Sequence, residues 1–425
     1  MYSPQVVAQA QEKVETRFGL PLLRTPIAEA IQRAEALELL YDPDKAQLTR
    51  ALSEEEQRFI VQEQLLYQID FRYAAERYLK INKGGKTLET ISPFWVSQEM
   101  VLGQIATREE DQNPLGGLTC VLKARQLGVS TLAEAFIVHA ITAQPYRRAL
   151  IASDATDTSA HLFGMAEIMY RHLPFFLKPG KTKYVTSGEQ RTIALENESS
   201  VVMRSGASMR GQKVDDSGEG KGEIGRGMTT SALHLSELAS WSFPEQIDDA
   251  LFPTIPLQPY VVGVLESTAK GRYNWWHKQW LKAEQGLGRF APVFIPWYAE
   301  PSKYRLPPPP TWVPSADTLA HARACEAEGP RWLGAPVSIT KEQLYWYERE
   351  RSAWTQDERL ADFLSEYPAT PAECFQYSGR SIFSLAVRER IKQQARPIHA
   401  VLLVEPHALA QERAKLVSEG QVPSA

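Results

Sequence analysis

Apolar positions at helical spacing dominate an early part of the chain. Over residues 53–80, the text SEEEQRFIVQEQLLYQIDFRYAAERYLK places its apolar residues where they share helix faces. Ser53 precedes this pattern and acidic residues follow it at once, which is typical of a helix N-cap. We therefore predict an N-terminal helical region.

The pattern then changes to short apolar runs that alternate with helices. The segment GGLTCVLKARQLGVSTLAEAFIVHAITA reads as a strand, a polar turn and a helix that opens at Ser130 and Thr131. The segment RRALIASDATDTSAHLFGMAEIMYRHL repeats this order, with its strand at 149–152. Strands that alternate with helices favour a parallel sheet. Three later apolar runs are predicted as further strands, at 232–235, 260–265 and 292–296.

Two stretches interrupt this alternation. The text VDDSGEGKGEIGRG at 214–227 holds five glycines among charged residues, which predicts a loop. The text RLPPPPTWVP at 305–314 must be extended, because each proline fixes φ and removes a hydrogen-bond donor. This second break marks a subdomain boundary or a surface strap.

Length and composition bound the class of protein. A chain of 425 residues exceeds the ~250 to 300 residues at which single cores stop growing, so one large domain with appendages, or two domains, is expected. No run approaches the ~20 apolar residues of a membrane-spanning helix, and the N-terminus lacks the apolar core of a signal peptide. We expect a globular protein that stays in a cytoplasm, with no membrane partner.

Cysteine usage and charge exclude some sites and leave one partner open. Cys120, Cys325 and Cys374 lie far apart, with no histidine at ligand spacing, so neither a disulfide framework nor a zinc site is supported. The formal net charge of -4 argues against a protein that coats nucleic acid. A local basic surface could still contact DNA phosphates.

The turn KARQLGVS supplies the parts of a phosphate-binding loop. Such a loop needs N–H groups at a helix N-terminus, a lysine for the phosphates and a hydroxyl for Mg²⁺. Gly128 and Ser130 fit the pattern G-x-x-x-x-G-K-[ST], but Val129 stands at the usual lysine position and Lys123 at the usual first glycine. An ordinary turn between a strand and a helix is the alternative.

Two later strand ends carry groups that suit nucleotide hydrolysis. The run ALHLSE ends in Glu237, a carboxylate that could orient an attacking water, and Ser236 stands where an aspartate normally supports magnesium. The run VVGVLEST ends in Ser267 and Thr268, whose hydroxyls could sense a terminal phosphate. Each signal alone is weak, since exposed acids and Ser-Thr turns are common at strand ends.

Taken in order, these motifs resemble the ATPase of large terminase subunits of tailed phages. The loop K-x-R-Q-x-G-x-S-T, then R-G-x-T before a strand with an acidic end, then strand-S-T-x-x-G follow that family's arrangement. Gln98 in ISPFWVSQEM and the text FLSEYPATPAECFQYSGRSIF extend the similarity, which spans roughly residues 54–383. The resemblance implies an α/β P-loop NTPase of the ASCE type, with a mainly parallel sheet flanked by helices, an N-terminal helical region and a small C-terminal lid.

The resemblance also implies the parts of the chain. They are an N-terminal helical region at 1–65, the ATPase core at 66–285, a lid or second subdomain at 286–385, and a linker or end segment at 386–425. In full-length members of the family, the motor is joined to a nuclease domain. The text after residue 383 offers no carboxylate cluster, so we expect no nuclease activity from this chain.

The cofactors implied are ATP and Mg²⁺, and the resemblance gives roles to individual residues. Some members of the family carry the loop lysine at the beginning of the motif, as Lys123 does here. Ser130 and Ser236 would face the magnesium ion, and Glu237 would be the catalytic carboxylate. Ser267 and Thr268 would couple hydrolysis to movement. The ATP-binding residues would be Gln98, Lys123, Arg125, Gln126, Gly128, Ser130 and Thr131.

Arg226 lies in the glycine-rich loop, where the family has an arginine thought to reach the ATP site of a neighbouring subunit. A guanidinium there could neutralise charge on the terminal phosphate in the transition state. The alternative is a solvated loop arginine. We predict the catalytic role for Arg226.

The function implied is ATP-driven translocation of double-stranded DNA into a viral procapsid. The implied partners are DNA, a portal protein, a small terminase subunit and further copies of the chain in a ring, a pentamer on the portal. The alternative is a structural part of the packaging complex that binds nucleotide or DNA without hydrolysis. A helicase-like remodeller is a third interpretation, but no helicase motif follows Gly271.

Overall fold

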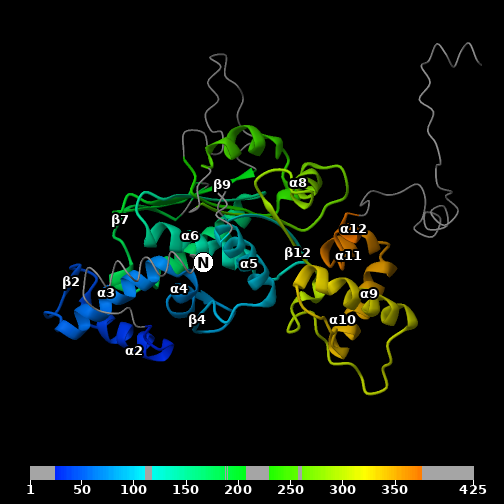
Figure 1. The fold of residues 1–425 in the computed structure, drawn as a ribbon, viewed down its shortest axis with the longest axis horizontal. Coiled ribbons are helices and arrows are strands. Elements are labelled where there is room, and N and C mark those ends of the chain that lie inside the picture. Colours follow the sequence, from blue (N-terminus) through cyan, green and yellow to red (C-terminus); the bar gives the residue numbers. More distant parts are fainter. Residues whose placement is uncertain are drawn as a thin grey trace, which may run out of the picture. The chain divides into compact units, whose positions relative to one another are not determined.

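The computed structural model describes residues 24–110, 117–186, 188, 190–206, 229–256 and 261–375. The part of the chain that it describes belongs to one compact unit, Met1–Ser378. Figure 1 shows the elements of this unit coloured along the sequence. Within the described ranges, no helix has the length and apolar character needed to cross a membrane.

The N-terminal region is helical, as predicted. It holds α2 (Ile27–Glu38), α3 (Glu54–Ile69) and α4 (Phe71–Arg77), with the hairpin β1 (Tyr41–Asp42) and β2 (Gln47–Leu48) after α2. The Ser53 side chain accepts from the Glu56 N–H, and the Glu56 carboxylate accepts from the Ser53 N–H, so a capping box starts α3. A second hairpin of β3 (Lys80–Asn82) and β4 (Leu88–Thr90) leads to α5 (Val96–Glu110).

The centre of the molecule is an eight-stranded sheet in the order β12-β5-β11-β10-β6-β9-β8-β7. Six strands are parallel: β5 (Gly117–Lys123), β6 (Arg148–Ser153), β9 (Ser200–Ser205), β10 (Ala232–Leu235), β11 (Val262–Ser267) and β12 (Ala291–Ile295). The strands β7 (Lys181–Val185) and β8 (Thr192–Leu195) complete one edge as antiparallel strands. The predicted α/β class with a mainly parallel sheet flanked by helices is confirmed.

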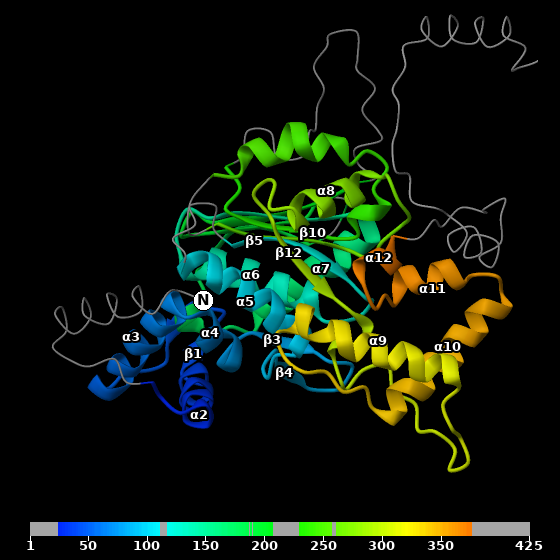
Figure 2. The same ribbon diagram turned by 45° about the vertical axis from the view of Figure 1, so that its right-hand side comes forward.

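Helices cover both faces of the sheet because its strands are apolar on both sides. The helices α5, α6 (Val129–Ala143) and α7 (Thr156–Arg171) pack on one face, and α8 (Trp275–Glu284) packs on the other (Figures 1 and 2). Alternate residues of β5 divide between the two cores: Val121 belongs to the α6 side, and Leu118, Cys120 and Leu122 to the α8 side. The sheet is therefore buried between two hydrophobic layers.

A small helical subdomain follows the last strand. It consists of α9 (Ala316–Leu333), α10 (Lys341–Gln356), α11 (Leu360–Glu366) and α12 (Pro371–Cys374). The proline-rich stretch 305–314 before α9 holds neither helix nor strand. The helix α3 crosses the predicted boundary between residues 65 and 66. The strand β12 lies after the predicted core boundary at residue 285, yet it pairs with β5 inside the sheet.

Candidate functional site

The loop between β5 and α6 has a backbone that depends on glycine at its end. Gln126 and Gly128 have φ values of 53° and 73°, and Gly128 is the N-cap of α6. A Cβ at Gly128 would lie 3.0 Å from Nε2 of Gln98 and 3.1 Å from the Trp95 ring, so a larger residue would meet both strain and crowding. The sequence therefore closes the loop tightly before the helix begins.

The start of α5 holds the carbonyl groups of this loop. Ser97 Oγ donates to the Leu127 carbonyl at 2.7 Å, and Gln98 Nε2 donates to the Gly128 carbonyl at 3.0 Å. Among the residues that the structure describes, the N–H groups of 126–128 find no acceptor. Free N–H groups at the N-terminus of a fifteen-residue helix form a favourable place for an anion.

A buried carboxylate on β11 joins the loop to the strand end. Glu266 is 1% exposed, and its Oε1 accepts from Ser130 Oγ at 2.5 Å and from Ser236 Oγ at 3.1 Å. Lys123 Nζ lies 3.6 Å from Glu266 Oε2. The structure thus brings together three of the predicted site residues around an acid to which the sequence analysis gave no role.

Behind Glu266 lies a second buried acid, bridged by a histidine. His234 Nε2 lies 3.1 Å from Glu266 Oε1, and its Nδ1 lies 2.7 Å from Glu134 Oε1. Burial opposes the charged imidazolium, but the two carboxylates outweigh it and raise the pKa of His234 to about 9. Burial also opposes the charge on Glu266, yet Lys123, His234 and Ser130 lower its pKa well below the ordinary range. Glu266 is therefore an ionised carboxylate held by cations and donors.

Glu237 follows β10 in a strained backbone conformation. Its φ is 54°, and it caps the short helix η3 (Leu238–Ser240). Burial raises the pKa of Glu237, while the Lys123 charge opposes that change, so the two side chains share one electrostatic environment. The sequence predicted Glu237 at the end of the strand 232–235, which is β10. In the structure β11 lies between β5 and β10, and this order puts Glu266 between Lys123 and Ser236.

The tip of β11 contacts the Glu237 turn directly. Ser267 is fully buried, and its Oγ accepts from the Ala239 N–H at 3.0 Å. Thr268 is 3% exposed. A displacement of η3 would therefore change the hydrogen bond at the end of β11. This contact agrees with the coupling role predicted for Ser267 and Thr268, which stays a prediction.

The helical subdomain contacts the loop at Arg125. Its Nε lies 3.2 Å from Glu366 Oε2, and its N–H donates to the Glu366 carbonyl at 3.2 Å. Tyr304 donates its hydroxyl to the Arg125 carbonyl. Arg125 thus connects the loop to α11 of the helical subdomain.

Two of the predicted ATP-binding residues lie apart from the Glu266 cluster. Thr131 Oγ1 faces Met165 Sδ at 3.9 Å, on the side of α7. Gln126 is exposed on the loop. Neither side chain contacts Lys123 or Glu266 among the hydrogen bonds of the described residues, so their contacts with ATP stay predictions.

Two further predicted residues remain to be placed. Gln98 is 5% exposed. Its amide nitrogen donates to the Gly128 carbonyl, and its amide oxygen accepts from the Trp95 N–H. The adenine contact expected for Gln98 stays a prediction. Arg226 and the glycine-rich loop around it lie outside the described residues. The predicted catalytic role of Arg226 therefore rests on the sequence.

The sequence analysis missed Glu134, His234 and Glu266 as members of the site. Each carried a signal: a titratable residue inside an otherwise apolar run, in AEAFIVHAI, ALHL and VVGVLE. Such residues are seldom fully buried unless they are paired. Their partners could not be found without the strand order, because Glu266 meets Ser130 across 136 positions of sequence.

The donor set suits a magnesium ion only together with phosphate oxygens. Within the described ranges, no group of three or more His, Cys, Asp or Glu side chains is placed to hold a metal ion. Mg²⁺ in nucleotide sites usually takes one or two protein groups, substrate phosphates and water. The hydroxyls of Ser130 and Ser236 beside Glu266 fit that kind of site.

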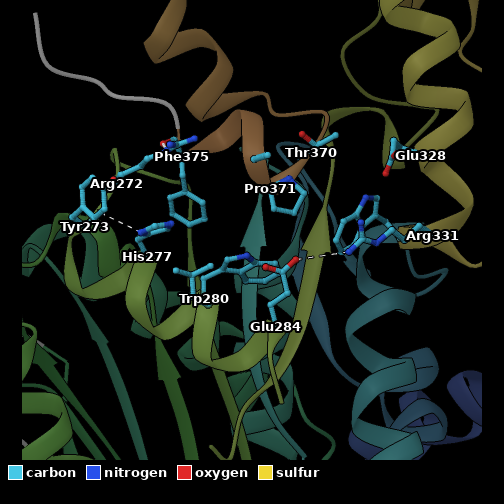
Figure 3. Close-up of a pocket in the computed structure, with 13 residues that line it drawn as sticks. Arg272, Tyr273, His277, Trp280, Glu284, Glu328, Arg331, Thr370, Pro371 and Phe375 are labelled. Carbon is cyan, nitrogen blue, oxygen red and sulfur yellow. Dashed lines mark hydrogen bonds and ion pairs between the residues drawn. The ribbon is translucent and has the colours of Figure 1, made fainter. Parts of the chain in front are cut away.

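A separate hollow of about 490 Å³ lies between α8, α9 and α12. Figure 3 shows His277 and Trp280 of α8 below it and Arg331 of α9 beside it, where Arg331 approaches Glu284 at 4.0 Å. None of the predicted site residues lines this hollow. It is thus distinct from the loop between β5 and α6.

Comparisons with known proteins return large terminases among solved structures. The ATPase domain of the Thermus phage P74-26 large terminase matches at 16% identity over 59% of this chain and 87% of that domain, with a TM-score of 0.36. The HK97 bacteriophage large terminase matches at 14% identity over 66% of this chain and 51% of that protein, with a TM-score of 0.39. A large terminase from a thermophilic bacteriophage, in complex with ATP-γ-S, matches at 12% identity, 54% and 49% coverage and a TM-score of 0.33. No family model and no curated protein matches the chain.

Proposed function

We propose that this chain is the motor ATPase of a large terminase, which hydrolyses ATP to move double-stranded DNA into a viral procapsid. One observation carries the proposal: a loop with unpaired N–H groups opens α6, and a buried lysine and a helix hydroxyl converge beside it at the carboxyl edge of a parallel sheet. The edge formed by the carboxyl ends of parallel strands is where α/β proteins bind ligands. The order of the motifs in the sequence is what points to the large terminase family.

The loop is suited to bind the phosphates of ATP. The N–H groups of 126–128 and the N-terminus of α6 favour negative charge, and Lys123 adds a cation. Lys123 Nζ lies beside Glu266 Oε2 in the structure. We expect nucleotide binding to draw the Lys123 ammonium from Glu266 towards phosphate oxygens.

Ser130 would hold the magnesium ion, with Ser236 nearby. Bound Mg²⁺ would neutralise phosphate charge and orient the terminal phosphate. The Ser130 hydroxyl donates to Glu266, which turns its lone pairs away from that carboxylate. The hydroxyl oxygen is therefore available to a cation.

Glu237 would orient the water that attacks the terminal phosphate. It lies at the end of β10, and Lys123 is the largest electrostatic influence that favours its ionised form. Only the ionised carboxylate can accept a proton from water. Arg226 is proposed to act from a neighbouring subunit on the transition-state charge, and Ser267 and Thr268 to pass movement from the Glu237 turn to β11.

The proposed partners follow from the family rather than from the contacts described here. They are double-stranded DNA, a portal protein, a small terminase subunit and further copies of this chain in a ring. The sheet order and the loop support nucleotide binding; the DNA-binding role rests on the motif resemblance alone.

The second candidate is a nucleotide-binding part of the packaging complex that does not hydrolyse ATP. Ser236, which brings no charge where the family has an aspartate, favours this alternative. Steady-state phosphate release by the purified chain, with Mg²⁺ and with or without double-stranded DNA, distinguishes the two. The motor predicts turnover that DNA stimulates, whereas the structural component predicts nucleotide binding without turnover.

A further inference from the structure

The strand order places a carboxylate where the motif lacks one. β10 and β11 are parallel neighbours, with Leu235 opposite Leu265. The next residue of each strand is Ser236 and Glu266, so these two lie side by side at the same level of the sheet. Ser236 Oγ donates to Glu266 Oε1 at 3.1 Å. The acid missing from β10 is present one strand away.

The same carboxylate contacts the helix hydroxyl that would hold magnesium. Ser130 Oγ donates to Glu266 Oε1 at 2.5 Å, although the two residues come from α6 and β11. The second oxygen, Oε2, is buried and has no hydrogen-bond partner among the described residues. The Lys123 ammonium lies 3.6 Å from it, the one ion pair of this oxygen within the part of the chain that the structure describes. A buried carboxylate oxygen without a donor has capacity for one more ligand.

The surroundings of Glu266 fix its position. His234 donates to it from behind, and Glu134 holds the other nitrogen of the same imidazole. Such outer partners orient metal-site carboxylates and keep them ionised. An ion pair with Lys123 alone would not require three donors on the opposite oxygen.

We infer that Glu266 is the carboxylate of the magnesium site, acting with Ser130 in place of the aspartate that Ser236 replaces. The inference rests on the proposed nucleotide site. Glu266 accepts from the Ser130 hydroxyl or from a metal-bound water, so it orients the ion without the carboxylate of β10. Lys123 then moves to the phosphates, and the metal neutralises the carboxylate that Lys123 has left.

The test compares nucleotide affinity with and without magnesium. A fluorescent, non-hydrolysable ATP analogue is titrated into the purified chain in Mg²⁺ and in EDTA, and the ratio of the two affinities measures metal dependence. Glu266→Gln should lower this ratio about 10- to 100-fold, the range found when a partner of a metal ligand is removed. Its affinity in EDTA should stay equal or increase, because a negative charge next to the phosphates has gone.

Two further variants separate metal binding from damage. Ser236→Asp combined with Glu266→Gln should regain most of the ratio, since a carboxylate at residue 236 reaches the same place from β10. Glu63→Gln alters another fully buried carboxylate, which accepts from the hydroxyls of Tyr73 and Tyr78 rather than from Ser130, so its ratio should stay near wild type. If Glu266→Gln does not fold, Glu266→Asp keeps the charge, shortens the reach and should lower the ratio at least several-fold.

The outcomes distinguish this inference from the proposed function. If the wild-type chain binds no nucleotide in either buffer, the proposed function fails and the inference fails with it. If the wild type shows metal-dependent binding and Glu266→Gln or Glu266→Asp keeps the same ratio, the proposed function stands and Glu266 has no metal role. Equal losses in Mg²⁺ and in EDTA would also overturn the inference, because they indicate a structural role only.

Discussion

The buried pair of Lys123 and Glu266 predicts a stability change that can be worked out from its geometry. Lys123→Met keeps the length of the side chain and removes its charge. Glu266, 1% exposed, then keeps its negative charge but loses one of the two cations beside it, and the His234 imidazolium remains. The variant should be less stable than the wild type in the absence of nucleotide.

The separation of 3.6 Å sets the magnitude. Two unit charges at that distance interact by about 5 kcal/mol at an effective dielectric constant of about 20, and breaking a buried pair costs about 3 to 5 kcal/mol. Ser130, Ser236 and His234 still donate to Glu266, so we expect the lower part of this range. For a unit of 378 residues, a loss of about 3 kcal/mol lowers the melting temperature by roughly 4 °C.

Thermal unfolding of four proteins tests this expectation. They are the wild type, Lys123→Met, Glu266→Gln and the double variant, which removes both charges together. The double variant should melt above Lys123→Met, since it no longer buries a carboxylate that has lost its lysine partner. A Lys123→Met protein whose melting temperature matches that of the wild type, or a double variant that is the least stable of the four, would refute the pairing of these two charges.

Three further predictions concern the chemistry. Glu237→Gln should abolish ATP hydrolysis in a phosphate-release assay while ATP affinity stays within a few-fold of wild type, and near wild-type turnover would remove Glu237 from its role. Because burial raises the pKa of Glu237 and the ionised form is the active one, kcat should fall as pH drops while still above the pKa of an ordinary glutamate; a kcat that stays flat down to that ordinary pKa would contradict this. Arg226→Ala should lower kcat with little change in ATP affinity, and mixing it with Glu237→Gln in mixed rings should restore part of the activity; verified mixed rings without activity would place Arg226 outside a neighbour's site.

Much of the fold could be predicted because local patterns were strong. The strand 232–235 and the N-cap at Ser53 stand in the structure as the sequence predicted them. β8 and β9 were missed, although TIAL and SVVMRS flank a short polar turn. Their signal is weak because the turn uses Glu198 at a φ of 63°, where glycine or asparagine is the usual marker.

The sequence predicted those candidate site residues that lie in local motifs, but not those that the strand order brings next to them. Lys123, Ser130 and Ser236 were found because they belong to motifs of fixed spacing. Glu266 was not, since its importance comes from lying between strands that are distant in sequence. The contact of Arg125 with Glu366 was missed for the same reason, because the position of α11 depends on tertiary packing.

A structure of the chain with ATP-γ-S and Mg²⁺ tests the central claim most directly. We predict the phosphates at the N-terminus of α6, with Lys123 Nζ within hydrogen-bond distance of a phosphate oxygen and Ser130 Oγ on the metal ion. Lys123 Nζ should then lie farther from Glu266 Oε2 than the 3.6 Å that separates them in the computed structure. Nucleotide bound elsewhere, or a bound nucleotide with Lys123 still on Glu266, would contradict the assignment of this loop as the ATP site.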